Sequence, residues 1–168
     1  NNNGSIESFD FGHDSLTPGT LQPLLDALLD IGVRKIKLDY NYNNVDFTVM
    51  ETNIALKEFD LSGYDMREED YQNLFHSIKK NKGLEELTLN YRGNHLYLPT
   101  RMKRLFEEML CENITLLDCC LYSRGNEEDK IYEMIRFHME VNRMSKRYVM
   151  KRENEKKTPA VIARIEEG

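Results

Sequence analysis

Three cysteines and four histidines are the residues of this sequence best suited to nucleophilic or metal chemistry. Cys111, Cys119 and Cys120 lack the spacing of a zinc finger or a zinc ribbon. A cysteine nucleophile needs a neighbouring base, and the histidines are scattered along the chain. The sequence also contains no Walker A loop, no G-x-G-x-x-G and no G-x-S-x-G. We therefore expect a protein that is not an enzyme and that has no catalytic residues, no metal site and no cofactor.

Polar residues in pairs, each pair separated by one apolar residue, indicate a second kind of chemistry, which is recognition. These pairs are Ser8 and Asp10, Lys35 and Lys37, Glu58 and Asp60, Glu86 and Thr88, and Asp118 and Cys120. If each pair lies on a strand, both of its side chains point to the same face, because side chains alternate along a strand. The carboxylates would then form an acidic binding surface for a basic or mixed partner, with Tyr40, Tyr91 and Tyr122 just beyond the strand ends as interface anchors.

The same charges have an alternative interpretation. Lys35 beside Glu58, and Lys37 beside Asp60, would neutralise each other across neighbouring strands, at roughly 0.2–1 kcal/mol per pair. Glu86 and Asp118 have no such neighbour in the sequence. They are therefore the better candidates for binding a partner, although a charged, solvated face needs no function.

A repeated pattern places these pairs. A polar residue is followed by apolar residues three, six and eight positions later, and the pattern starts at Asn3, Asp30, Asn53, Asn81 and Asn113, at intervals of 27, 23, 28 and 32 residues. The expected spacing of leucine-rich repeats is about 20–29 residues. The apolar triplets predict strands. Cys119 occupies one of these apolar positions, so we expect it to be a small buried residue.

Between the triplets, the apolar period changes to that of a helix. The predicted helical stripes are Leu21, Leu24, Leu25, Leu28 and Leu29; Tyr71, Leu74, Phe75 and Ile78; Met102, Leu105, Phe106, Met109 and Leu110; and Ile131, Met134, Ile135 and His138. On the last stripe, His138 fits a hydrogen-bonded core histidine better than a ligand. Only fourteen residues separate Leu38 from Asn53, and a truncated helix, a 3₁₀ turn or an extended segment would fit there, the short or irregular helix being favoured.

The predicted architecture is α/β: a right-handed leucine-rich repeat solenoid of about five repeats, with parallel strands on the concave face and helices on the convex face. We place the repeat array at residues 1–143 and an extension of the C-terminal capping helix at 144–157. Residues 158–168 form a tail that is either loosely held or a short docking segment. The basic run from Arg143 to Arg152 is expected to belong to a solvated cap, which ends the stack.

Composition limits the partners. The 168 residues are 40% hydrophobic and 31% charged, which is typical of a folded protein. A net charge of −6 disfavours nucleic acid, and no apolar run approaches the roughly 20 residues that cross a bilayer. The odd number of cysteines favours a reducing compartment, the cytoplasm. Because the chain begins with Asn1 and not methionine, we expect it to be part of a longer protein.

The repeats resemble the ribonuclease-inhibitor type of leucine-rich repeat. LKEFDLSGYDMREEDYQNLFHSIKKNKGLEEL, from the third repeat, is similar to that family's LxxLxLSxNxLxxxGxxxLxxxLxxNxxLxxL, with Tyr64 where a strand-end asparagine often stands. This departure puts the asparagine ladder of that repeat in doubt, and the fourth repeat has to bulge around RGNHLYLPT. Within this type the chain is similar to the C-terminal domain of tropomodulins and to the arrays of NOD-like receptors and bacterial effectors, over about residues 3–143.

This resemblance implies a curved parallel sheet whose side chains bind another protein. We therefore expect an interaction module that captures its partner through the concave face, with Lys35, Lys37, Glu58, Asp60, Glu86, Asp118, Tyr91 and Tyr122 as the candidate contact residues. One alternative is capping of an actin filament end, as in tropomodulins. Another is substrate recognition within a pathogen effector, delivered into a host cytoplasm, or within an innate-immune receptor. The oligomeric state is left open.

Overall fold

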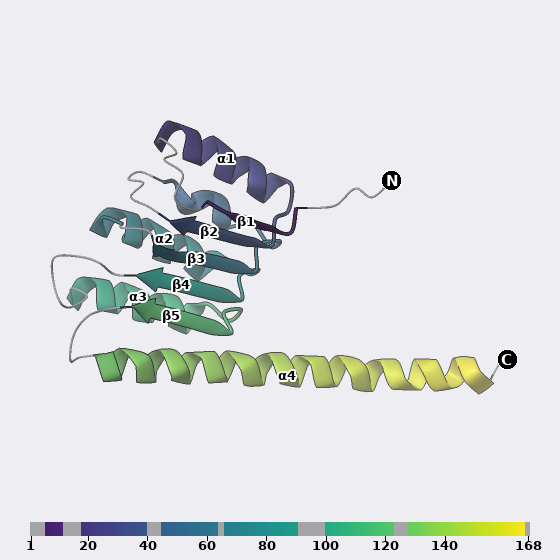
Figure 1. Cartoon of the computed structure of the whole chain (residues 1–168). Coiled ribbons are helices and arrows are strands. Elements are labelled where there is room, and N and C mark those ends of the chain that lie inside the picture. The colour runs from purple at the N-terminus through teal and green to yellow at the C-terminus, as the bar shows by residue number, and fades with distance from the viewer. Residues whose placement is uncertain are drawn as a thin grey trace.

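The computed structural model describes residues 6–11, 18–39, 45–63, 66–90, 100–122 and 128–166, without the side chains of residues 151–166 and of a few residues next to the gaps. Its five strands are β1 (Ser8–Asp10), β2 (Lys35–Asp39), β3 (Glu58–Gly63), β4 (Glu86–Asn90) and β5 (Asp118–Tyr122). They form one sheet in the order β1-β2-β3-β4-β5, and every neighbouring pair is parallel (Figure 1). Consecutive strands are thus neighbours, as expected for a stack of repeats.

Helices connect most of the strands on one side of this sheet (Figure 1). The helices are α1 (Pro18–Asp30), α2 (Glu68–Lys80), α3 (Thr100–Glu112) and α4 (Glu128–Glu166). The predicted apolar stripes of α1 and α2 face the sheet, and all of α2's stripe residues are buried. The α/β prediction and the placement of strands and helices are confirmed.

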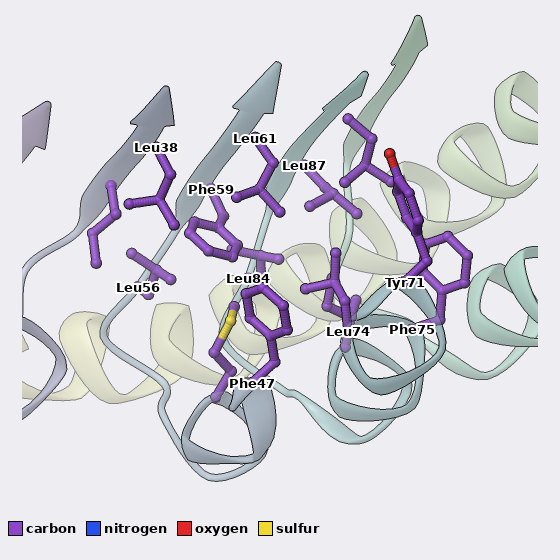
Figure 2. Packing of buried hydrophobic residues seen from close by; sticks show 14 of the residues in the cluster. Leu38, Phe47, Leu56, Phe59, Leu61, Tyr71, Leu74, Phe75, Leu84 and Leu87 are labelled. Carbon is purple, nitrogen blue, oxygen red and sulfur yellow. The ribbon is translucent and has the colours of Figure 1, made fainter. Parts of the chain in front are cut away.

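The core is one continuous cluster between strands and helices. Figure 2 shows Leu38, Phe59, Leu61 and Leu87 extending from successive strands toward Tyr71 and neighbouring residues of the helical layer. Cys119 is buried among these strand residues, as predicted. At the first strand the prediction is wrong in part, because Ile6 of the first triplet is 50% exposed. In the described residues β1 is an edge of the sheet, and no earlier strand covers it.

The short second repeat uses a 3₁₀ turn, one of the three forms that its length allowed. This turn, η1, spans Phe47–Met50, and the Asp46 side chain accepts the N–H of Thr48 at 2.9 Å. Phe47 and Met50 are buried, and the ring of Phe47 lies 6.2 Å from that of Phe59. Two buried side chains here fill the layer that a full helix fills in the other repeats.

Asparagines at the repeat starts tie each repeat to the one before it. The Asn81 amide donates to the carbonyls of Met50 and Asn53, and its oxygen accepts the N–H groups of Gly83 and Leu84. Asn113 makes the corresponding four bonds one repeat later. One repeat earlier, Asn53 accepts two N–H groups in the same way and donates to the carbonyl of Leu29. A ladder of asparagines therefore links the repeat starts. Tyr64, at the strand-end position, and all but the last residue of the predicted bulge at 92–100 lie outside the described residues.

The ladder ends in α4. Asn142, on a helix rather than in a turn, donates to the carbonyls of Asn113 and Leu116 at 3.0 and 2.8 Å. Ile135 and Met139 are buried beside it, so α4 closes the core next to β5 and α3. The helix runs without a break across the predicted boundaries at 143/144 and 157/158. Docking by residues 158–168 remains a prediction.

Candidate protein-binding face of the sheet

The face of the sheet opposite the helices carries two rows of polar side chains. The register confirms that the predicted pairs lie side by side on neighbouring strands. The first row is Ser8, Lys35, Glu58, Glu86 and Asp118, and the second is Asp10, Lys37, Asp60, Thr88 and Cys120. All ten are at least partly exposed, whereas the alternate strand residues between them point into the core. The sheet thus presents one continuous polar surface.

The lysines on β2 are paired with carboxylates. Lys35 Nζ lies 2.5 Å from Glu58 Oε2, and this hydrogen bond is the main cause that raises the pKa of Lys35. Lys37 is next to Asp60 of β3 in register. Its Nζ nevertheless forms an ion pair with Asp10 of β1, on the other side of β2, at 3.7 Å. Cross-strand neutralisation is therefore confirmed for Lys35 and Glu58.

Acidic residues gather on the remaining strands. Glu58, Glu86 and Asp118 are consecutive neighbours across β3, β4 and β5, and like charges placed directly opposite are destabilising. We call these three residues, together with Asp60, the acidic face. A positively charged partner would relieve their mutual repulsion, so the acidic face is suited to binding a basic surface.

Cys120 lies among these carboxylates. Partial burial, and then the charges of Asp118, Asp60 and Glu86, raise the pKa of its thiol. A cysteine nucleophile requires the opposite shift, since the thiolate is the reactive form. Cys120 is therefore poorly placed for catalysis. Within the described residues there is also no group of three or more histidine, cysteine or acidic side chains that could hold a metal ion.

Basic side chains of α4 reach the edge of this face, and the sequence did not predict this contact. Lys146 Nζ lies 2.8 Å from a carboxylate oxygen of Glu85, the residue just before β4. This hydrogen bond is the largest cause that lowers the pKa of Glu85, and Lys57 contributes from 3.7 Å. Arg143 lies 3.9 Å from Asp118. Part of the basic run therefore pairs with the array and is not simply solvated.

Two predicted anchors fall outside this description. Tyr91 and Tyr40 are not among the described residues, and Tyr122 is described only as the last residue of β5, where its backbone pairs with Asn90. His138 does have a polar partner, but it is only partly buried and so is not the core histidine that was predicted. Its Nε2 lies 3.6 Å from Cys111 Sγ, a contact that joins α4 to α3.

Exposed apolar side chains are the features that the sequence analysis missed. Ile31, Ile54 and Ile114 each follow the residue that starts a repeat, and each is more than half exposed. A second group lies on α4. Both groups are visible in the sequence. The isoleucines recur one position after the repeat starts, and the last helix has a second apolar period. Neither group lies on the apolar period that predicts the core.

No family model matches the chain, and a search of curated proteins finds no significant match. Two solved structures are similar in fold. The actin-binding site 2 of leiomodin-1 superposes with a TM-score of 0.69 at 14% identity, covering 92% of this chain and 90% of that one. The C-terminal domain of tropomodulin from Caenorhabditis elegans gives 0.67 at 13%, covering 90% and 92%.

At this identity the likeness concerns the fold. It supports the resemblance to tropomodulin-type repeat domains, while the ribonuclease-inhibitor subtype and the similarity to receptor and effector arrays remain predictions. No helix among the described residues has both the length and the apolar character that a bilayer crossing requires. The chain has the parallel-sheet repeat architecture found in the leiomodin and tropomodulin domains.

Proposed function

We propose that this chain is a non-catalytic protein-binding domain and that actin is its partner. The observation that carries the proposal is the extent of the likeness to the actin-binding site of leiomodin-1, which covers 92% of this chain and 90% of that one. A match of this extent concerns the whole array rather than a single repeat. The three free cysteines and an actin partner both favour a cytoplasmic localisation.

The contact surface that we propose is the acidic face. Glu86 has no ion-pair partner within the part of the chain that the structure describes, and Asp118 is paired only loosely, with Arg143 at 3.9 Å. Exposed carboxylates steer the approach of a basic partner, and pairing with its basic groups offsets the cost of removing them from water. Lys35 and Lys37 would set the opposite border of the contact.

Actin assembly measures the proposed function directly. Purified chain is added to pyrene-labelled actin that elongates from capped seeds, with one set of seeds blocked at the barbed end and the other at the pointed end. Capping is expected to slow elongation from one set of seeds only, whereas binding along filaments would appear as co-sedimentation. Unchanged elongation at both ends, together with no binding to monomeric or filamentous actin by sedimentation, would exclude actin as the partner.

The acidic face is tested by charge reversal. Glu58, Asp60, Glu86 and Asp118 are changed together to lysine, and we expect actin binding to fall at least about a hundredfold, because several attractive contacts become repulsive. The matched control changes four exposed acidic residues outside this face, Glu7, Asp30, Glu107 and Glu133, to lysine and so alters the net charge equally. If both variants fold by circular dichroism and lose binding equally, the acidic face is not the contact surface.

A different protein with a basic surface is the second candidate, and the same acidic face favours it. If actin binding is absent, the two variants can be compared as baits for proteins from a lysate. A protein that the wild-type chain and the control variant capture, and that the acidic-face variant does not, would identify this alternative.

A further inference from the structure

The helix α4 carries a second apolar stripe that does not face the array. Phe137, Val141, Met144 and Tyr148 are 65%, 37%, 54% and 61% exposed. Their intervals of four, three and four residues are those of a coiled-coil seam, in which apolar residues recur every 3.5 positions on average. The buried residues of the same helix, Ile135, Met139 and Asn142, follow a separate row.

The two rows lie on opposite sides of the helix. At 100° per residue, Phe137, Val141, Met144 and Tyr148 point roughly 180° away from Ile135, Met139 and Asn142. Figure 1 shows α4 as the last layer of the stack, with β5 and α3 on one side and none of the described elements on the other. We call Phe137, Val141, Met144 and Tyr148 the outer stripe.

We propose that the outer stripe is a homodimer interface, in which α4 of a second copy of this chain packs antiparallel against it. Antiparallel pairing about a two-fold axis between Val141 and Met144 places Val141 against Met144 of the other copy, and Phe137 against its Tyr148. Each layer then joins two different apolar side chains, as in an antiparallel coiled coil. The two arrays extend away from the helix pair on opposite sides, so they do not compete for this surface.

Charge complementarity favours a second copy of this chain as the partner and an antiparallel arrangement of the two helices. Glu140 and Arg147 are exposed and border the outer stripe on the same flank of α4. Glu140 has a loose pair with Arg143 at 3.9 Å, and Arg147 has no ion-pair partner in the described part of the chain. In the antiparallel arrangement, Glu140 of each copy lies opposite Arg147 of the other, giving two symmetric attractions. Parallel pairing would place Glu140 near Ser145 and Arg147 near Arg152, without this gain.

Dimer formation is measured by sedimentation velocity of the whole chain at concentrations from about 1 to 200 μM, a range suited to a short helical interface. We expect a reversible monomer–dimer equilibrium. Val141→Glu combined with Met144→Glu should raise the dissociation constant at least about tenfold, because charges enter the seam. Ile54→Glu combined with Ile114→Glu makes the same change at exposed isoleucines elsewhere and should leave dimerisation unchanged.

Direction is tested by exchanging charges. Glu140→Arg or Arg147→Glu alone should weaken the dimer, and the double exchange should restore it, because the opposite charges meet again. The relative direction of the two helices is also tested by the distance between nitroxide labels. One label is attached to each copy at Lys130→Cys, in a chain with Cys111 and Cys120 changed to serine. The antiparallel pair separates the two labels by about 37 Å along the helix at 1.5 Å per residue, whereas parallel helices bring them within roughly 20 Å.

A chain that is monomeric over the whole range overturns the proposal. If that monomer loses actin binding when the outer stripe is mutated, the stripe belongs to a different partner. A short label distance, or failure of the double exchange to restore the dimer, overturns the antiparallel arrangement. The sedimentation, charge-exchange and label-distance results do not depend on whether actin binds to the acidic face, so the two proposals can fail separately.

Discussion

At the scale of single residues, the buried asparagines decide how the repeats are spaced. Asn81 and Asn113 are completely buried, and each satisfies two carbonyls of the preceding repeat and two N–H groups of its own turn. An unpaired buried polar group costs roughly 1–3 kcal/mol. Replacing one of these side chains leaves several such groups unpaired at once.

Asn81→Ala is therefore expected to lower the free energy of unfolding by about 3 kcal/mol or more, because four backbone groups lose their partner. Equilibrium urea unfolding followed by circular dichroism measures the change. Asn73, exposed on α2, offers the matched control; its replacement by alanine should alter the stability by less than about 0.5 kcal/mol. Similar losses in both variants would mean that the ladder contributes little.

Gly83 shows how closely the repeats approach each other. An added Cβ would overlap the Cα of Ile54 in the preceding repeat, and backbone atoms cannot move aside as a flexible side chain can. We expect Gly83→Ala to destabilise the chain by about 1–3 kcal/mol. Gly19→Ala adds a methyl group to open space in α1 and should be neutral or stabilising by up to about 1 kcal/mol. Thermal unfolding distinguishes the two, and equal midpoints would contradict this account.

At the scale of elements, α4 is held to the array by polar as well as apolar contacts. Ile135 and Met139 close the core, Asn142 ends the ladder, and Lys146 pairs with Glu85. The pair is partly exposed, so its contribution to stability is modest. It nevertheless gives the junction between α4 and the sheet a distinct dependence on pH.

The pKa of Glu85 is below its ordinary value of 4.5 in the folded chain, mainly because of Lys146. Folding therefore favours the ionised carboxylate. The resulting stabilisation is complete above the ordinary pKa and is lost as the pH falls through the lower, folded pKa. Glu85→Gln should lower the unfolding midpoint by about 1–3 °C at pH 7, and the difference from wild type should shrink in acid.

Glu107→Gln is the control for this measurement, because Glu107 is exposed on α3 and has no ion pair among the described residues. Its midpoint should follow the wild-type midpoint from pH 7 to pH 3. A Glu85→Gln difference that stays constant over that range would show that the ion pair with Lys146 is not its cause.

At the scale of the whole molecule, stability depends on closing both the core and the ladder. Each repeat contacts chiefly its neighbours, so the last repeat needs a cap over its exposed apolar side. His138, Asn142, Arg143 and Lys146 hold α4 to the rest of the chain, and all four lie in its first half. The rest of α4 continues beyond these contacts (Figure 1).

Two truncations separate these halves. Ending the chain after Asn126 removes α4 and exposes the core beside β5, so we expect aggregation or loss of cooperative unfolding. Ending it after Met150 retains every described α4 residue that is buried or paired with the array and should shift the unfolding midpoint by no more than a few degrees. Size-exclusion chromatography and thermal unfolding provide the comparison. A well-folded chain without α4 would show that the helix is not a cap.

The sequence by itself determined the strands, the helices and the two polar rows of the sheet. Triplets such as Leu84, Leu87 and Leu89 recur at a fixed spacing, and strand periodicity then dictates which residues point outward. The identity of the neighbouring strands follows as well, because consecutive repeats stack. The pairing of Lys35 with Glu58 was therefore accessible from sequence alone.

Only the tertiary structure decided which partners meet across long stretches of chain. The contact of Lys146 with Glu85 joins residues 61 positions apart, and neither residue stands out locally. The four hydrogen bonds of Asn81 likewise depend on how far one repeat is shifted along the next, which the apolar period does not specify. The outer stripe of α4 can be recognised only because the array covers the other side of the helix. Side-chain period identifies a helix face, but packing decides which face is covered.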